Sequence, residues 1–169
     1  MTIMLAERAA LYGDRTAIVA PEGAFTYRNL LEASGRVASF LLAGARDLEE
    51  RPVAFMAPPG FHYVAMQWGI WRAGGIATPL SLFQPRPELE YALGDAAPAA
   101  ALAHPDFAAR LGPIAAGRGL RFALSSEAME IRGKNVFLEY WRRPDDTRKA
   151  FRNGWFRTGD VAVVENGIW

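Results

Sequence analysis

The first 124 residues alternate between two patterns of apolar and polar positions. Short apolar runs stand between turn residues, and longer segments with apolar residues at helical spacing separate them. Short continuous runs are typical of buried strands, whereas the 3.6-residue period is typical of a helix with one buried face. The pattern predicts strands at 16–20, 24–26, 51–57, 76–80, 99–103 and 120–124, and helices at 5–11, 27–43, 61–73, 87–96 and 105–116.

The order of these elements predicts the fold class. A strand, a helix and a strand follow one another between Arg51 and Leu80, and the same order continues to Leu124. Such units place consecutive strands in one mostly parallel sheet with helices packed on its faces. We therefore expect an α/β fold for residues 1–123.

The pattern changes after Ser125. Met129 to Arg132 has the composition of a strand, and a helix is expected to begin with Pro144 at its first position, where the missing amide costs nothing. Asn166-Gly167 is typical of a hairpin turn. We expect residues 124–169 to form a small β-rich piece.

The helix at 27–43 has a clear start. Thr26 is expected to cap it, because a threonine side chain can accept a hydrogen bond from a free amide of the first turn. The apolar stripe of this helix leaves the opposite side to solvent. The residues expected on the solvent side are Arg28, Glu32 and Arg36.

Charge and residue counts exclude several kinds of site. Nineteen basic against eighteen acidic residues leave a net charge of +1, so no strong field would concentrate a nucleic acid or an anionic membrane. The chain has no cysteine and only two histidines, His62 and His104, which leaves few residues for a zinc or Ser-His-Asp site. No apolar run approaches the roughly 18 residues of a membrane-spanning helix. Because the segment before Arg15 already has the pattern of an amphipathic helix, we expect no leader peptide and a cytoplasmic location.

Several side chains that could bind a ligand also have a simpler interpretation. Tyr63, Trp68 and Trp71 are interpreted as core packing and not as a platform for base stacking, because they lie at helical spacing in an apolar segment. His62 is interpreted as a surface or capping histidine in preference to a ligand. Gly74-Gly75 is interpreted as the stop of the helix 61–73 and not as a phosphate cradle.

A first block of residues resembles the acyl-CoA synthetases of the adenylate-forming superfamily. It is most similar to the malonyl-CoA and methylmalonyl-CoA synthetases and matches the opening hairpin and first long helix of that family. Asn29 stands where the family usually has a glutamate, which weakens the expected reciprocal capping box with Thr26. The segments that carry this resemblance are Asp14–Ile18, Phe25–Leu30, Arg51–Phe55, Gln67–Gly75, Ala77–Leu80 and Glu88–Asp95.

A second block, Glu130–Trp141 with Asn153–Asp160, resembles the motif at the end of the family's large domain. In that motif the aspartate after Thr-Gly accepts hydrogen bonds from the ribose hydroxyls of the nucleotide. The resemblance therefore implies that Asp160, with Thr158 and Gly159, binds the ribose of ATP or AMP. A carboxylate suits this role, because hydrogen bonds to a charged group contribute about 1.5–3 kcal/mol. An isolated Thr-Gly-Asp is more often a turn. The preceding Gly-Trp-Phe-Arg is what favours a relationship to the synthetase motif.

The resemblance implies an ATP-dependent acid–thiol ligase. In this family a carboxylate attacks the α-phosphorus of ATP to give an acyl-AMP, and the thiol of CoA then displaces AMP. ATP, Mg²⁺ and CoA are the implied cofactors, and malonate or methylmalonate is the implied carboxylate. The family's long stretch between the two blocks, with its glycine-rich phosphate loop, is missing here, and we expect the small carboxy-terminal domain to be absent. Because two anions must react, catalysis needs cations and amide donors on the phosphates, so we expect the chain to be inactive alone.

Two other functions stay open. The chain can be a non-catalytic α/β module that binds a protein partner, such as a full-length synthetase or its missing part. It can also be the product of an internal deletion without a selected role. Nucleotide binding separates the ligase lineage with retained function from both alternatives.

Overall fold

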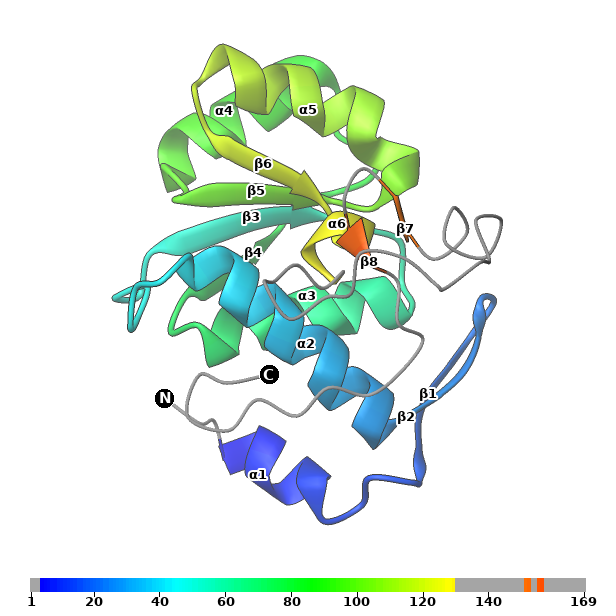
Figure 1. The fold of residues 1–169 in the computed structure, drawn as a ribbon. Coiled ribbons are helices and arrows are strands. Elements are labelled where there is room, and N and C mark those ends of the chain that lie inside the picture. Colours follow the sequence, from blue (N-terminus) through cyan, green and yellow to red (C-terminus); the bar gives the residue numbers. More distant parts are fainter. Residues whose placement is uncertain (1–3, 130–150, 153–154, 157–169) are drawn as a thin grey trace, which may run out of the picture. The chain divides into compact units, whose positions relative to one another are not determined.

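The computed structural model describes residues 4–129, 151–152 and 155–156 (Figure 1). The chain forms two compact units, Met1–Met129 and Glu130–Trp169. The first unit contains all of the α/β elements described below.

The second unit contributes two short strands to the described residues. β7 (Phe151–Arg152) and β8 (Trp155–Phe156) pair antiparallel. The helix expected from Pro144 and the turn expected at Asn166-Gly167 lie outside the described residues. Of the strand expected at 129–132, only Met129 is described, and it lies in a turn.

The first unit begins with a helix and a hairpin. α1 (Met4–Ala10) buries the small side chains of Ala6 and Ala9, and Ala9 packs with residues of α2. The larger Leu5 is exposed, because the alanines form the face that lies closest to the rest of the unit. β1 (Thr16–Ala20) and β2 (Gly23–Thr26) pair antiparallel. The expected helix and both expected strands are confirmed.

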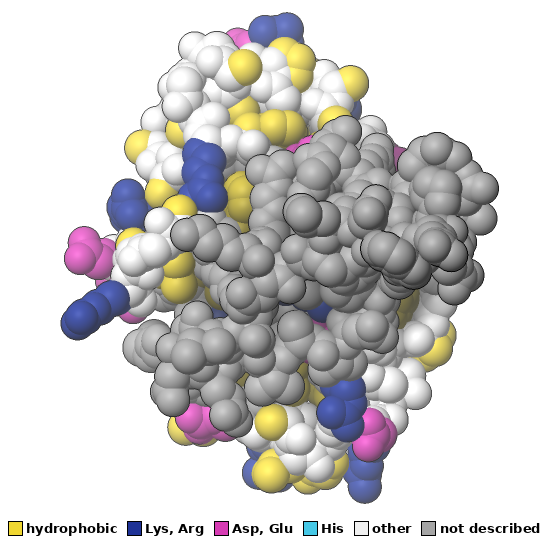
Figure 2. All heavy atoms as spheres, in the orientation of Figure 1, with side chains coloured by type: hydrophobic (Ala, Val, Ile, Leu, Met, Phe, Trp, Pro, Cys, Tyr) yellow, Lys and Arg dark blue, Asp and Glu magenta, His cyan; other side chains and the backbone are white. Residues whose placement is uncertain are grey.

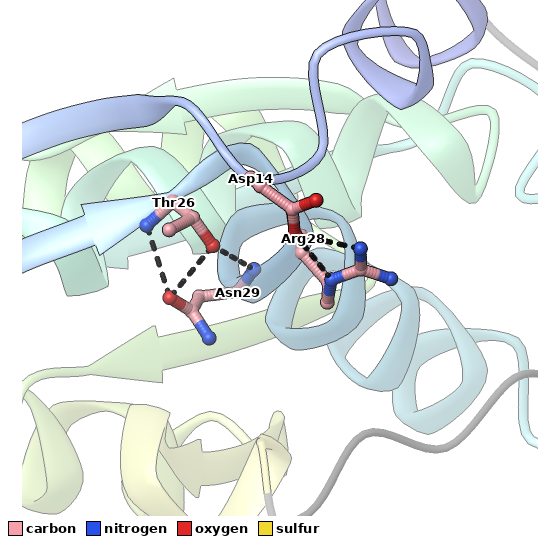
Figure 3. A network of polar contacts seen from close by, with 4 residues as sticks. All are labelled: Asp14, Thr26, Arg28 and Asn29. Atoms are coloured by element: carbon pink, nitrogen blue, oxygen red, sulfur yellow. Dashed lines mark hydrogen bonds and ion pairs between the residues drawn. The ribbon is translucent and has the colours of Figure 1, made fainter.

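A reciprocal pair of hydrogen bonds caps α2 (Tyr27–Leu42). The Asn29 amide donates to Thr26 Oγ1 at 3.2 Å, and the Thr26 amide donates to Asn29 Oδ1 at 2.9 Å (Figure 3). The expected cap is confirmed, and both hydrogen bonds of the capping box are present. The shorter asparagine side chain reaches the Thr26 amide and completes the box.

The loop before β1 satisfies the other two amides of this first turn. The Tyr27 amide donates to the Arg15 carbonyl at 3.0 Å, and the Arg28 amide donates to the Gly13 carbonyl at 2.9 Å. The Arg28 side chain also forms an exposed ion pair with Asp14 at 2.7 Å (Figure 3). Solvent screens an exposed ion pair, so the backbone bonds are the main tie between this loop and α2.

Four parallel strands form the central sheet, in the order β4-β3-β5-β6. Each strand pairs in parallel with its neighbours, and Ala54 of β3 lies between Thr78 of β4 and Ala101 of β5. The expected mostly parallel sheet is confirmed. The strands are β3 (Pro52–Met56), β4 (Ile76–Pro79), β5 (Ala100–Ala103) and β6 (Arg121–Leu124).

The connections between these strands are helical, and a short helix follows the last strand. The single helix expected at 105–116 is divided into a 3₁₀ turn and α5, and the ring of His104 accepts a hydrogen bond from the Asp106 amide at 3.3 Å in the 3₁₀ turn. A histidine cap of this kind could not be read from apolar spacing. The elements are α3 (Phe61–Arg72), α4 (Arg86–Ala96), the 3₁₀ turn η1 (Pro105–Phe107), α5 (Ala108–Gly117) and α6 (Ser125–Ala128).

The carboxyl end of α3 confirms the predicted helix stop. The Gly74 amide donates to the Trp71 carbonyl at 3.0 Å, and the Gly75 amide donates to the Ile70 carbonyl at 2.9 Å. Gly74 has a φ of +77°, a left-handed conformation that glycine adopts without a steric cost. These two bonds are those of a Schellman motif, so Gly74-Gly75 ends the helix as predicted.

The sheet is the middle layer of the unit (Figure 1). Helices α2 and α3 cover one face, and α4 and α5 cover the other. Successive residues of β3 point to opposite faces: Val53 and Phe55 pack toward α2 and α3, whereas Ala54 and Met56 pack toward α4 and α5. Because both faces are covered, β3 and β5 are apolar without alternation, as expected for strands of a parallel sheet.

One expectation about α2 is wrong in part. Arg28 is exposed as predicted, but Glu32 and Arg36 are half-buried. Arg36 donates to the Met129 carbonyl at 3.1 Å, because α6 and the turn after it pack against this side of α2. Burial raises the pKa of Glu32, and the nearby Arg36 and Arg28 oppose that rise.

Charges of both signs are mixed on the described part of the visible surface. Figure 2 shows basic and acidic side chains interspersed around the described part of this face. Within residues 4–129 and the two short strands, no helix is long and apolar enough to span a membrane.

Candidate functional site at the carboxyl edge of the sheet

The connections that leave the carboxyl ends of β3 and β5 lead to opposite faces of the sheet. β3 leads into α3 on one face of the sheet, whereas β5 leads into η1 and α5 on the other face (Figure 1). The two strands are neighbours in the sheet and run parallel. In open α/β sheets, ligands bind outside the carboxyl ends of the strands at such a switch point. The side chains at this edge are therefore the candidate site.

Three polar side chains, from the segments that follow three different strands, meet at this edge. His62 lies in the first turn of α3, His104 directly follows β5, and Ser125 directly follows β6. His62 Nδ1 lies 2.6 Å from Ser125 Oγ, and the rings of His62 and His104 meet edge to face with centroids 4.9 Å apart. Ser125 is fully buried and His62 is half-buried, so the contacts lie within the packed edge of the unit.

A carboxylate from the hairpin lies at the amino end of α3. Glu22 Oε1 accepts a hydrogen bond from the Phe61 amide at 2.7 Å. The pKa of Glu22 lies below its ordinary value because its own amide and that of Phe61 donate to the carboxylate, and His62 and His104 add to this effect. A negative charge at this position also faces the positive end of the helix dipole.

The hairpin is held at this edge by packing as well as by charge. The rings of Phe25 and Phe61 are stacked, with centroids 4.1 Å apart. Gly60 makes room for the carboxylate, since a Cβ atom there would lie 2.3 Å from Glu22 Oε1. The hairpin β1–β2 thus packs against the junction of α3 with the loop that follows β3.

The environment of His62 disfavours its charged form. Burial lowers the pKa of His62, and the neighbouring His104 lowers it further, whereas Glu22 and Asp106 oppose the shift. This environment therefore favours the neutral form of the His62 imidazole. A neutral ring has one donor and one acceptor nitrogen, so its contact with Ser125 is an ordinary neutral hydrogen bond.

This arrangement is suited to holding strand ends together more than to chemistry. No group of three or more His, Cys, Asp or Glu side chains within the described residues could hold a metal ion. Serine and histidine are residue types that can act as a nucleophile and its general base. The Ser125 hydroxyl is fully buried, however, so a substrate has no route to it.

Three further residues are predicted from the resemblance to bind the ribose of the nucleotide. Asp160, Thr158 and Gly159 lie outside the described residues. Their role therefore stays a prediction from the resemblance.

Of the interpretations of the other candidate residues, that of the aromatic residues is confirmed and that of His62 is wrong. Trp68 is buried, and Tyr63 and Trp71 pack against the core clusters, so core packing is confirmed for the three aromatic residues. The interpretation of His62 as a surface or capping residue is wrong, because it is half-buried and bonded to Ser125. The local sequence could not indicate this bond, because Ser125 lies 63 positions further along the chain.

Sequence reasoning missed Glu22 and Ser125, and it gave His104 no role. A usable signal existed for two of them, because His104 and Ser125 each follow the last residue of a predicted strand, where parallel strands present their carboxyl ends. Glu22 had no comparable signal. It lies in a hairpin turn, and its partner Phe61 is 39 positions away.

The fold of the first unit is that of the acyl-CoA ligases. It is similar to apo MatB from Rhodopseudomonas palustris, with a TM-score of 0.63 and 25% identity over 76% of this chain and 28% of that chain. A second similar structure is the anthranilate CoA ligase AuaEII in complex with anthranoyl-AMP, with a TM-score of 0.63. Its identity is 22%, over 74% of this chain and 26% of that chain, which supports the fold alone.

The chain belongs to the AMP-binding enzyme family, whose family model matches residues 5–141. It is 36% identical to the mitochondrial malonate–CoA ligase ACSF3 of Homo sapiens, over 63% of this chain and 19% of that protein. Identity to the Bos taurus protein of the same name is 32%, over 67% of this chain and 20% of that protein. The chain therefore spans about a fifth of the length of these relatives. The resemblance inferred from the sequence is confirmed.

Proposed function

We propose that this chain is a shortened member of the ATP-dependent acid–thiol ligases that act on malonate-type carboxylates. The observation that carries the proposal is the 36% identity to human malonate–CoA ligase over 63% of the chain. In such a ligase the carboxylate and ATP form an acyl-AMP and release pyrophosphate, after which the thiol of CoA displaces AMP. Mg²⁺ would neutralise the phosphates of ATP during the first step.

Two parts of the chain would have different roles. Residues 1–123 would form the scaffold, with the strand ends of β3 and β5 facing the ligand side of the sheet. Residues 124–169 would contribute the nucleotide-side motif, in which Asp160 accepts hydrogen bonds from the ribose and Thr158 and Gly159 shape the turn before it. We keep the cytoplasmic location as a prediction.

Nucleotide affinity tests this proposal. Isothermal titration of the purified 169-residue chain with ATP and Mg²⁺ should give weak but measurable binding. Asp160→Asn should weaken that binding about tenfold or more, because hydrogen bonds to a charged group are worth about 1.5–3 kcal/mol. Asp95→Asn is the matched control, since Asp95 is an exposed aspartate near the end of α4, and it should leave the affinity unchanged.

Two results would count against the proposal. Absence of ATP binding would contradict a retained nucleotide site, and equal binding by wild type and Asp160→Asn would contradict the role of Asp160. If ATP does not bind and a second polypeptide co-purifies with the chain, the non-catalytic binding module would be favoured.

A further inference from the structure

A loop at the carboxyl edge of the sheet presents a phenylalanine to solvent. The loop, residues 80–85, joins β4 to α4. β4 pairs in parallel with β3, and the Leu80 amide donates to the Phe55 carbonyl at 2.8 Å, so the loop begins at the edge where β3 ends. Phe83 in this loop is 92% exposed, the largest exposed fraction among the large apolar side chains of the described residues.

Hydrogen bonds fix the conformation of this loop. Arg110 of α5 donates to the carbonyls of Leu82 and Gln84. These two residues flank Phe83, whose own amide donates to Ser81 Oγ at 3.3 Å. Leu82 packs against the core cluster on the α4 and α5 side of the sheet, whereas its neighbour Phe83 is left in solvent. Because the loop is already ordered, a ligand that binds to Phe83 pays little for ordering it.

The position and chemistry of the Phe83 ring indicate which group it can bind. In open α/β sheets, ligands bind outside the carboxyl ends of the strands. A phenyl ring has no hydrogen-bonding group for a phosphate, a ribose hydroxyl or a carboxylate, but its face can stack on a flat aromatic group such as a base. Malonate, ATP and CoA are the ligands of the proposed ligase reaction. Among them, only ATP and CoA carry such a group, and in both it is adenine.

We propose that Phe83, on the loop that Arg110 holds, binds the adenine ring of an adenine nucleotide by stacking. The identity of the ligand rests on the proposed ligase function, since ATP, AMP and CoA share this ring. The stacking does not involve Asp160, which is assigned to the ribose, so the two assignments can fail separately.

Isothermal titration of the complete 169-residue chain with AMP and, separately, with CoA tests the stacking. Phe83→Ala should weaken the binding of at least one of them about tenfold, as expected for the loss of one stacked base. Phe83→Leu should behave in the same way, whereas Phe83→Tyr keeps the aromatic face and should stay within about twofold of wild type. Tyr91→Ala is the matched control, because Tyr91 is an exposed aromatic residue in the middle of α4, and it should leave both affinities unchanged.

Probes without the base separate recognition of adenine from other contacts. Ribose 5-phosphate and 4′-phosphopantetheine keep parts of AMP and CoA but lack adenine, so Phe83→Ala should not change their binding. A loss of affinity for AMP alone would assign the site to ATP or AMP, and a loss for CoA alone would assign it to CoA. Either result supports the stacking, whereas equal affinities of wild type and Phe83→Ala for both nucleotides would overturn it.

The nuclear Overhauser effect gives a measurement on the wild type that a change in folding does not imitate. Ring protons of Phe83 should show contacts to H2 or H8 of the bound adenine, and the absence of such contacts at saturation would overturn the proposal. Arg110→Ala should weaken the same binding about threefold or more, because the loop loses two hydrogen bonds and must be ordered by the ligand. Unchanged affinity in Arg110→Ala would overturn the role of Arg110.

The outcomes distinguish this inference from the proposed function. AMP binding that Asp160→Asn weakens and Phe83→Ala does not would overturn the stacking and leave the proposed function standing. CoA binding that depends on Phe83, in a chain that does not bind ATP, would support the stacking and count against the nucleotide site of the ligase. If Phe83→Ala changed only self-association of the chain, measured by sedimentation, the ring would belong to an interface between copies and the stacking would be overturned.

Discussion

At the residue scale, single polar side chains join segments that are far apart in the chain. Arg121 of β6 donates to the Leu41 carbonyl at 3.2 Å and to the Phe40 carbonyl, and its guanidinium lies 4.1 Å from the centroid of the Phe40 ring. A cation at the carboxyl end of α2 satisfies free carbonyls and complements the helix dipole. Glu22 has the opposite role at the amino end of α3, where its carboxylate accepts a hydrogen bond from the free amide of Phe61.

The pH dependence of stability should report the contact of Glu22. Its pKa lies below the ordinary value of 4.5, so its contribution to folding is complete above that value and is lost as the pH falls through the lower pKa of the folded state. Glu22→Gln should therefore be less stable than wild type near neutral pH. The two proteins should converge in acid, as measured by urea unfolding at several pH values between about 6 and about 3.

Glu49→Gln is the matched control for this measurement. Glu49 is an exposed glutamate in the loop before β3, and its substitution should leave the shape of the stability profile unchanged. If the free energies of unfolding of wild type and Glu22→Gln differed by the same amount at every pH through the acid range, the assigned role of Glu22 would be refuted.

At the element scale, helices α2 and α3 pack closely against each other at Gly69. A Cβ atom on Gly69 would lie 2.5 Å from Val37 Cβ and 2.9 Å from the Ser34 carbonyl oxygen. Because the second contact is with backbone, a side-chain rotation cannot relieve it and the helices must separate. Gly69→Ala should therefore lower the free energy of unfolding by about 1–3 kcal/mol in urea denaturation.

A second helical glycine provides the control for Gly69→Ala. Gly117 ends α5, and a Cβ atom there would have no neighbour within 4 Å. Gly117→Ala should be neutral or stabilise the protein by roughly 0.5–1 kcal/mol, because alanine loses less backbone entropy than glycine on folding. If both variants lost stability equally, helix packing at Gly69 would not be the cause.

At the scale of the whole molecule, the chain has part of a large domain and little of what a ligase needs at the phosphates. It spans about a fifth of its malonate–CoA ligase relatives. Its sequence contains no glycine-rich phosphate cradle, and its two lysines, Lys134 and Lys149, both follow residue 129. The α/β unit therefore offers the phosphates of ATP no lysine ammonium group.

We expect the 169-residue chain alone to catalyse no ATP–pyrophosphate exchange with malonate and Mg²⁺ above the rate without protein. Reaction of two anions needs positive charge and amide donors aligned on the phosphates. A full-length malonate–CoA ligase assayed in parallel is the positive control. Exchange by highly purified chain that Asp160→Asn abolishes would show that the chain is a ligase by itself.

Local patterns predicted most elements of the α/β unit correctly, because apolar periodicity and helix stops are properties of neighbouring residues. The strand residues 52–56 and the helix stop at Gly74 are examples. Local patterns were insufficient where a side chain meets a distant segment. Arg36 was expected in solvent and instead bonds to the Met129 carbonyl, 93 positions away.

The sequence by itself determined the fold class and the family, because both depend on the order of apolar runs and on short motifs such as Phe25–Leu30. Only the tertiary structure decided which strands are neighbours and which polar side chains meet. His62, His104 and Ser125 follow three different strands, and they meet because the order β4-β3-β5-β6 places the carboxyl ends of β3, β5 and β6 side by side. That order depends on the faces on which the crossover helices pack, which is a property of the complete unit and of no single segment.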